Sequence, residues 1–260
     1  MILSRRVSLN DVQLDSLDER IIISGFEEDE PNESFRTAEL YFTAGSRVTN
    51  RHLGQKKITV KFLLKVKKAN FAARNEILEK ITGWANGGGT LKSTSRPERQ
   101  ISVTSTKKPR ISDPRKWDSE YQIIFEAIEK PYWENTTEES QTLAQGSEGS
   151  GTITMNGNTW ATADALIQNK SGGTINTLSL TVNGYTMSFT DLGLANNAYL
   201  TIDHTDVKGN AVLRVRIGET SKLANKTGDD EFILVPGDNT ISYSADGDVI
   251  VTVSARGRYL

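Results

Sequence analysis

Apolar and polar residues alternate along much of the first half of the chain, and this period of two predicts β-strands. In the longest such segment, residues 56–68, the apolar residues Ile58, Val60 and Phe62 are separated by polar ones. One face of this predicted strand is therefore apolar and the other is mostly basic. Two further segments show the same alternation, residues 99–106 and 119–129, and residues 19–26 are predicted as a short apolar strand.

One segment of the first half repeats its apolar positions at helical spacing instead. Ile77, Ile81 and Trp84 stand at positions i, i+4 and i+7, which places them on one stripe of a helix. Asn70 is suited to cap the start of this helix and Gly87 to end it. Three other residues widen the stripe: Phe71, Leu78 and Ala85. A single helix among strands packs its stripe on a sheet, so we expect an α+β domain.

After residue 150 the pattern predicts strands only. The candidates are short and closely spaced: residues 151–157, 174–189, 198–203, 211–218, 231–237 and 239–260. Turn-forming pairs separate them, including Asn183-Gly184, Pro236-Gly237 and Asp246-Gly247, and we expect the last to form a tight hairpin. Such spacing is typical of an antiparallel β-sandwich.

The two halves meet at a stretch with few apolar residues. A strand-like segment ends in Pro131-Tyr132-Trp133, and residues 134–151 contain only Leu143 and Ala144 as aliphatic side chains. Few contacts cross such stretches, so they often separate domains. The sequence therefore predicts a mainly β protein with a first domain at residues 1–133, a linker at 134–150 and a second domain at 151–260.

Charge is distributed unevenly, although the net charge is only −2. Residues 10–39 carry 10 acidic and 2 basic side chains, and residues 45–116 carry 18 basic and 4 acidic ones. Residues 134–260 are acidic, with 15 acidic against 8 basic side chains. Such separation is typical either of surfaces that pair electrostatically or of solvated faces, and both interpretations stay open.

No constellation of residues indicates catalysis. Cysteine is absent, which excludes thiolate nucleophiles, and the two histidines, His52 and His204, fall in different predicted domains away from any nucleophile-elbow pattern. The glycines of residues 87–89 follow the predicted helix, whereas a phosphate site needs them before one. We therefore expect no enzyme, no catalytic residues, no cofactor and no cofactor-binding residues.

Metal binding is also disfavoured. Asp203, His204 and Asp206 lie close in sequence, but a polar strand end is the more common explanation of such a pattern. Residues 244–249 lack most ligands of a calcium loop. No apolar run reaches 18 residues, so we expect no metal site and no membrane span.

Two kinds of binding remain possible alternatives. The basic residues 56–68 could contact phosphates, but no aromatic residues for base stacking are interleaved with them. The second domain could bind carbohydrate through an exposed aromatic side chain. The candidates for that role are Trp160, Tyr185, Tyr199 and Tyr243.

Five segments in order resemble the distal tail protein family of siphophages, which are bacteriophages with long, non-contractile tails. They are residues 44–64, 73–91, 117–134, 199–215 and 231–260. The shared layout is Gly-x-Arg before a basic strand, one helix, a strand ending in Pro-Tyr-Trp, a Leu-x-Ile-Asp strand end, a Leu-x-Pro-Gly-x-Asn turn and a final Arg-Tyr. The resemblance covers nearly the whole chain.

The resemblance implies a structural virion protein with no catalytic activity. Family members form a hexameric ring at the distal end of the phage tail, joining the tail tube to the tail-tip hub, or baseplate, and letting DNA pass through the lumen without specific binding. The first domain, a β-sandwich or split barrel with one helix, builds the ring. The second, a galectin-like β-sandwich, lies outside. The chain would be made in the host cytoplasm and assembled into the virion.

The partners implied are other copies of this chain, the tail tube protein, the tail-tip hub (tail-associated) protein and a receptor-binding protein on the second domain. We expect Pro131-Tyr132-Trp133 to anchor the end of the ring domain. We further hypothesise that the acidic block at 10–39 faces the basic block at 45–116 of the next copy, with lysines 56–68 at contacts and not in the channel. Two alternatives are a two-domain carbohydrate-binding adhesion protein and a tail-tube or tail-completion ring protein.

Overall fold

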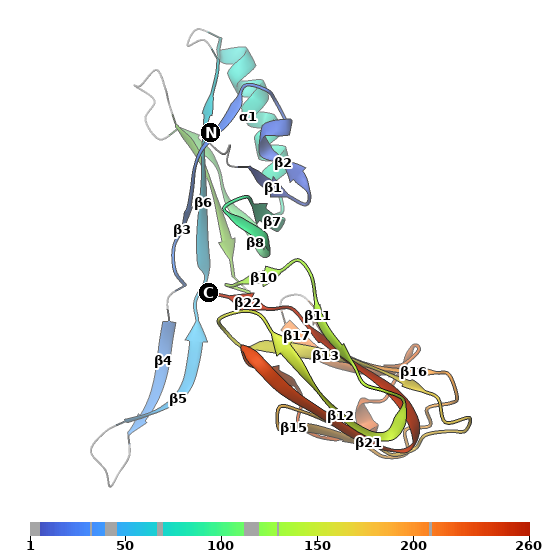
Figure 1. Ribbon diagram of the computed structural model, residues 1–260. Helices are drawn as coiled ribbons and strands as arrows, with labels where there is room; N and C mark the ends of the chain where they lie inside the picture. The colour runs from blue at the N-terminus through green and yellow to red at the C-terminus, as the bar shows by residue number, and fades with distance from the viewer. Residues whose placement is uncertain are drawn as a thin grey trace. The chain divides into compact units, whose positions relative to one another are not determined.

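The computed structural model describes residues 6–31, 33–39, 46–66, 70–111, 120–128, 130–207 and 210–260. The chain forms two compact units, an N-terminal unit of Met1–Glu134 together with Leu260 and a C-terminal unit of Asn135–Tyr259 (Figure 1). Both are built mainly of antiparallel strands, and α1 (Phe71–Ala85) is the one α-helix in the described part of the chain. The mainly β architecture expected from the alternation is therefore confirmed.

The N-terminal unit contains one strongly extended antiparallel sheet. Its strands are β1 (Val7–Leu9), β2 (Val12–Gln13), β3 (Ile21–Glu28), β6 (Lys56–Leu64), β7 (Gly89–Ser93), β8 (Arg96–Ile111) and β9 (Tyr121–Ala127). They are ordered β2-β1-β7-β8-β9-β6-β3, and β10 (Trp133–Asn135) pairs with β8. A short 3-10 helix, η1 (Leu14–Ser16), follows β2. Strand β8 is long enough to pair with β7 along its first half and β9 along its second.

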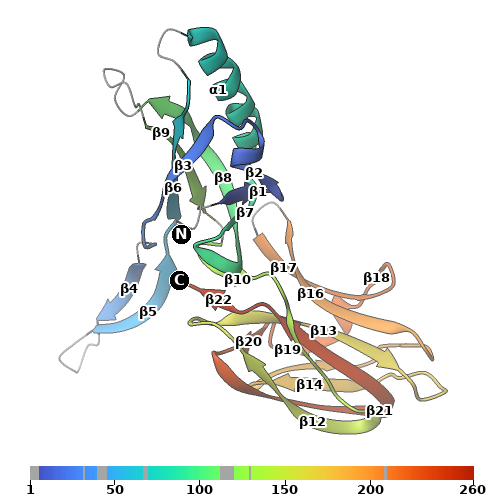
Figure 2. The same ribbon diagram turned by 45° about the horizontal axis from the view of Figure 1, so that its top comes forward.

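Helix α1 packs on one face of this sheet (Figure 2). Ile77 and Ile81 are fully buried, and the indole of Trp84 meets the ring of Phe125 edge-on at 6.1 Å. Asn70 caps the helix through its side chain, as expected, by accepting the Ala73 amide at 3.1 Å. The other members of the predicted stripe are at least partly buried.

Phe71 is also predicted to lie on the buried stripe, but its side chain is 65% exposed. It stands in the first turn of α1, with the guanidinium of Arg74 over its ring.

Two further strands, β4 (Glu33–Glu39) and β5 (Ser46–Leu53), form a separate antiparallel ribbon. Among the described strands they pair only with each other.

The C-terminal unit is a pair of curled antiparallel layers joined by one long strand. Its elements are β11 (Glu139–Thr142), β12 (Gly146–Met155), β13 (Ala161–Asn169), β14 (Leu178–Val182), β15 (Tyr185–Phe189), β16 (Tyr199–Val207), β17 (Asn210–Ile217), β18 (Thr220–Ser221), η2 (Leu223–Asn225), β19 (Lys226–Gly228), β20 (Phe232–Leu234), β21 (Gly237–Ala255) and β22 (Arg258–Tyr259). The order along the sheet is β18-β17-β16-β13-β21-β14-β15-β19.

The expected tight hairpin at Asp246-Gly247 is wrong, because both residues lie within the long strand β21. It runs without reversal from Gly237 to Ala255. Its first half pairs with β14 and its second half with β13, so the chain changes layer at Asp246 instead of turning back. A hairpin turn requires the flanking segments to pair with each other, whereas here each half finds a different partner.

Strand β13 lies at the centre of this unit and is absent from the strands expected from the sequence. It pairs with β16, β20 and β21. Its inward positions are Ala161, Ala163, Ala165 and Ile167, all buried. Alanine contributes a weak apolar signal and has low strand propensity, so the alternation along this segment is faint.

The predicted linker is also corrected, because residues 134–150 are largely strands of the C-terminal unit. Strand β11 pairs with Ser254 and its neighbours on β21, and β12 continues from Gly146 along the first half of the same strand. The glycines that suggested a linker make room for packing instead. A Cβ on Gly149 would lie 2.7 Å from the ring of Tyr243, and one on Gly151 would lie 2.4 Å from Leu143.

Within the described residues, no helix has the length and apolar character needed to cross a membrane.

Candidate functional surfaces

The partly buried carboxylate of Glu28 in the N-terminal unit faces three cationic or N–H groups. Its Oε1 accepts from Arg96 Nε at 2.6 Å, and its Oε2 accepts from the indole N–H of Trp133 at 2.9 Å. The Nζ of Lys56, a residue only 2% exposed, lies 3.4 Å from Oε2. Burial opposes ionisation of Glu28, but these donors outweigh it and hold its pKa below the usual value. The cluster ties together β3, β6, β8 and β10.

Trp133 is fully buried at this cluster. Its ring lies 6.2 Å from that of Phe26, and the guanidinium of Arg96 lies over it at 5.6 Å. The expectation that Trp133 anchors the end of the first domain is therefore confirmed.

The two charged blocks of the N-terminal unit pair with each other inside one chain. Lys92 meets Asp11 at 2.6 Å, and Lys57 lies 3.9 Å from Asp29. Three more pairs join the same blocks: Lys56 with Glu28, Lys61 with Glu27 and Lys80 with Asp18.

These intrachain pairs engage several of the charges that the sequence hypothesis assigned to contacts between copies, and that hypothesis stays a prediction. Adjacent antiparallel strands place acidic side chains of β3 beside lysines of β6, so the separation along the sequence becomes pairing in space. Residues 67 and 68 lie outside the described residues.

The glycines of residues 87–89 have a conformational and packing role. Gly88 has φ +75°, and a Cβ there would lie 2.1 Å from the carbonyl oxygen of Val103. The side chain of Asn10 donates to the Gly88 carbonyl and accepts from the Thr90 amide. The Asn10 side chain therefore takes up polar backbone groups of this loop that a ligand would otherwise contact.

The residues considered as metal ligands are used elsewhere. Asp203 accepts from Arg216 at 3.0 Å. His204 places Nδ1 3.3 Å from Asp164 Oδ1 and Nε2 3.1 Å from the Asp230 carbonyl. Burial lowers the affinity of His204 for a proton, but these two acceptors outweigh it and raise its pKa. The side chains of Asp206 and His52 lie outside the described ones, and the described residues contain no group of three acids or histidines able to hold a metal.

The four aromatic candidates for sugar stacking do not form one platform. Tyr243 is buried, and its hydroxyl donates to the Ala144 carbonyl at 2.9 Å. Trp160 and Tyr199 are about half exposed, at 48% and 47%, but Trp160 precedes β13 and Tyr199 pairs with its far end at Gln168. Tyr185 packs against the core.

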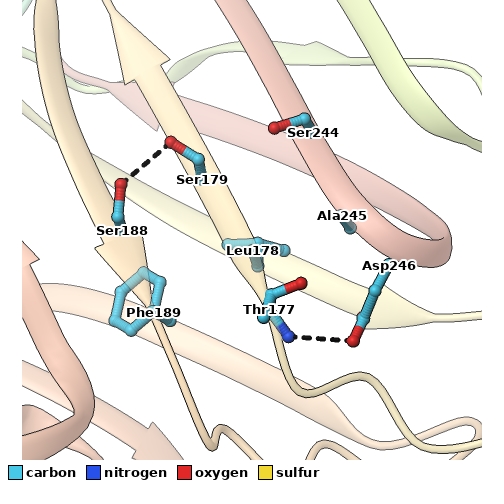
Figure 3. A pocket seen from close by; sticks show the side chains of 8 residues that line it. All are labelled: Thr177, Leu178, Ser179, Ser188, Phe189, Ser244, Ala245 and Asp246. Carbon is cyan, nitrogen blue, oxygen red and sulfur yellow. Dashed lines mark hydrogen bonds between the residues drawn. The ribbon is translucent and has the colours of Figure 1, made fainter.

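A shallow pocket of about 320 Å³ lies where β21 changes layer, beside β14 and β15 (Figure 3). Eight residues line it: Thr177, Leu178, Ser179, Ser188, Phe189, Ser244, Ala245 and Asp246. The Asp246 carboxylate is held by the amides of Asn176 and Thr177 at 3.1–3.2 Å. The hydroxyls of Ser179 and Ser188 are hydrogen-bonded at 3.0 Å. Nothing in the sequence pattern pointed to this pocket, because the strand change that opens it depends on long-range pairing.

No protein-family model matches the sequence, and no curated protein matches it. Among solved structures, the crystal structure of SPP1 Dit, described as a paradigm of the hub adsorption apparatus in phages infecting Gram-positive bacteria, matches with a TM-score of 0.69 at 10% identity, covering 97% of this chain and 98% of that one. A chain of the phage P2 baseplate in its activated conformation covers 97% and 98% at a TM-score of 0.46 and 9% identity. The resemblance expected from the sequence is thus confirmed at the level of the fold: this chain has the mainly β, two-unit fold of SPP1 Dit, a siphophage distal tail hub protein.

Proposed function

We propose that this chain is a structural protein of a phage virion, located at the distal end of the tail. Six copies form a ring that joins the tail tube to the tail-tip hub and lets DNA pass through its lumen. The observation that carries the proposal is the fold match to SPP1 Dit, which includes nearly all of both chains. A shared fold alone does not imply function, so the assembly is what an experiment must test.

The chemistry of the described side chains supports a structural role over a catalytic one. The acids, lysines and histidine singled out above are engaged in ion pairs and hydrogen bonds that join strands. We therefore infer that the chain acts through its surfaces.

The N-terminal sheet offers surfaces suited to a ring. Among the described strands, β3 pairs only with β6 and β2 only with β1, so each leaves one edge unpaired. Open sheet edges are normally covered, because their free amides and carbonyls otherwise pair with any available strand. In a head-to-tail ring, each copy would cover an edge of the next.

The partners proposed besides further copies are the tail tube protein and the tail-tip hub protein, with a receptor-binding protein on the C-terminal unit. A tail-tube or tail-completion protein is the runner-up. The two differ in stoichiometry, since a tube protein would stack many rings and a hub only one.

The test is the mass of the full chain in solution by analytical ultracentrifugation, followed by negative-stain imaging. Six chains of 28.7 kDa give about 172 kDa, and the particles should show six-fold symmetry with a central hole. If the chain stays monomeric even when mixed with the tube and hub proteins of the same virion, the ring proposal is wrong. Long stacked tubes would favour the runner-up.

A further inference from the structure

One outer face of the C-terminal unit carries two rows of hydroxyl groups. Successive residues of a strand point to opposite sides of the sheet, and many of the outward positions of β12, β21, β14 and β15 are serine or threonine, with acidic residues among the others. The register aligns four of them in one row across the strands, at Ser150, Ser242, Thr181 and Thr186. A parallel row contains Ser244, Ser179 and Ser188, with Glu148 of β12 paired beside Ser244. We call these two rows the hydroxyl face.

The hydroxyl face is unusual because it is polar but carries no positive charge. The four strands contain no lysine or arginine within residues 146–155, 178–189 and 237–248. Outward strand positions commonly carry charged side chains, which keep sheets soluble and discourage edge pairing. On the neighbouring β19, Lys226 has a nearly buried ammonium that is bonded to Asp230.

The pocket at the kink of β21 lies at one end of the second row (Figure 3). It combines the hydroxyls of Ser179, Ser188 and Ser244 with the carboxylate of Asp246, while Leu178 supplies an apolar wall. Because two backbone amides already orient that carboxylate, no side-chain ordering is needed before it accepts donors from a ligand. Its volume of about 320 Å³ is at the lower end of the range for small-ligand sites.

The chemistry of the face selects among ligand classes. A polyanion such as DNA needs cations, and the charges beside the face are acidic instead, at Glu148 and Asp246. A protein hot spot needs large aromatic or arginine anchors, which the rows lack. Hydroxyls both donate and accept hydrogen bonds, so they complement a ligand that is itself neutral and rich in hydroxyls.

We propose that the hydroxyl face binds a neutral polysaccharide, with one sugar ring in the pocket beside Asp246 and the chain lying across the serine and threonine rows. The proposal goes beyond the ring function and does not depend on it. A short oligosaccharide should bind weakly, with a Kd of about 1 mM, because each hydroxyl contact replaces one with water. Several copies in one particle would multiply the contacts with a long polymer.

The test uses the full chain and isothermal titration with uncharged hexasaccharides of glucose, galactose and N-acetylglucosamine. Hexagalacturonate serves as the charged counterpart of the galactose probe. At least one uncharged probe should bind, and hexagalacturonate should bind at least about tenfold more weakly, because its carboxylates would approach Asp246.

Two variants locate the site. Ser242→Lys places a long charged side chain in the middle of the first row and should weaken binding at least tenfold. Thr201→Lys, on the outward side of β16 where Thr201 pairs with Leu166, is the matched control and should bind normally. An unchanged thermal midpoint in both variants shows that they fold.

The proposal is overturned if every uncharged probe fails to bind at about 10 mM, ten times the expected Kd. Equal binding of hexagalacturonate, or equal loss in the Thr201→Lys control, also overturns it. If Ser242→Lys instead blocks association with another virion protein while no saccharide binds, the face is a protein-docking surface. The solution mass is measured on the same samples, so a failure of the ring proposal is seen separately.

Discussion

At the scale of single residues, one cluster of polar groups around Glu28 joins four strands of the N-terminal unit. Glu28 is the common acceptor for Arg96, Trp133 and Lys56. Because Lys56 is buried, removing the carboxylate leaves a charge that neither water nor another acid can easily satisfy. Loss of the Glu28 carboxylate should therefore lower the free energy of unfolding by more than loss of an ordinary surface ion pair does.

We predict that Glu28→Gln lowers the free energy of unfolding at pH 7 by about 2 kcal/mol, as measured by urea denaturation. The folded-state pKa of Glu28 is lowered, so its contribution is present above the unfolded pKa of about 4.3 and is lost as the pH falls further. The difference between wild type and variant should shrink accordingly in acid. Glu79→Gln, at an exposed position of α1, is the control and should change stability little. A constant difference from pH 7 to acid would contradict the assignment.

A glycine in the C-terminal unit allows a second test. Gly149 lies against the ring of Tyr243, whose hydroxyl is bonded to the Ala144 carbonyl. We predict that Gly149→Ala destabilises the protein by about 2 kcal/mol through overpacking, measured by thermal or urea unfolding. Gly173→Ala is the control, because a Cβ there meets nothing within 4 Å. Equal effects of the two substitutions would show that the ring moves aside.

At the scale of elements, local pattern identified strands that alternate strongly and missed those that do not. The apolar alternation around Ile58 and the helical spacing around Ile77 correspond to β6 and α1. The alanine-rich β13 and the glycine- and serine-rich first half of β12, residues 146–150, gave no such signal. Both strands pair through their backbones with β21, which lies about 90 residues away in sequence.

We predict that β12 exchanges its amide hydrogens as a strand and not as a linker. Amides in residues 146–150, the part of β12 that the sequence assigned to a linker, should exchange at least about 100-fold more slowly than those of Gly172 and Gly173, measured by hydrogen exchange and mass spectrometry. The turn glycines lie outside any strand and provide the internal control. Fast exchange throughout residues 146–150 would restore the linker interpretation.

At the scale of the whole molecule, several charges of the two blocks are paired within one chain. The pairs that connect Asp11, Glu27, Glu28 and Asp29 to basic residues all lie within the N-terminal unit. If copies assemble as proposed, we expect their contacts to rest chiefly on other features, such as the unpaired edges of the sheet.

We therefore predict that the assembled species is insensitive to salt. Its mass in sedimentation should stay constant between about 0.05 and 0.5 M sodium chloride, a range over which the screening length falls severalfold. Lys61→Gln removes an exposed intrachain pair and should leave that mass unchanged. Dissociation at high salt would favour the hypothesis of charge pairing between copies.

The sequence by itself determined the mainly β class, the helix α1 with its Asn70 cap, the buried anchor at Trp133 and the resemblance to distal tail proteins. These depend on local periodicity, capping and ordered motifs, which act over a few residues. The tertiary structure alone decided the partners of the charged residues, the conversion of residues 134–150 into strands and the pocket at Asp246. Each of those depends on which distant strands pair, and backbone pairing in a sheet leaves little trace in side-chain composition.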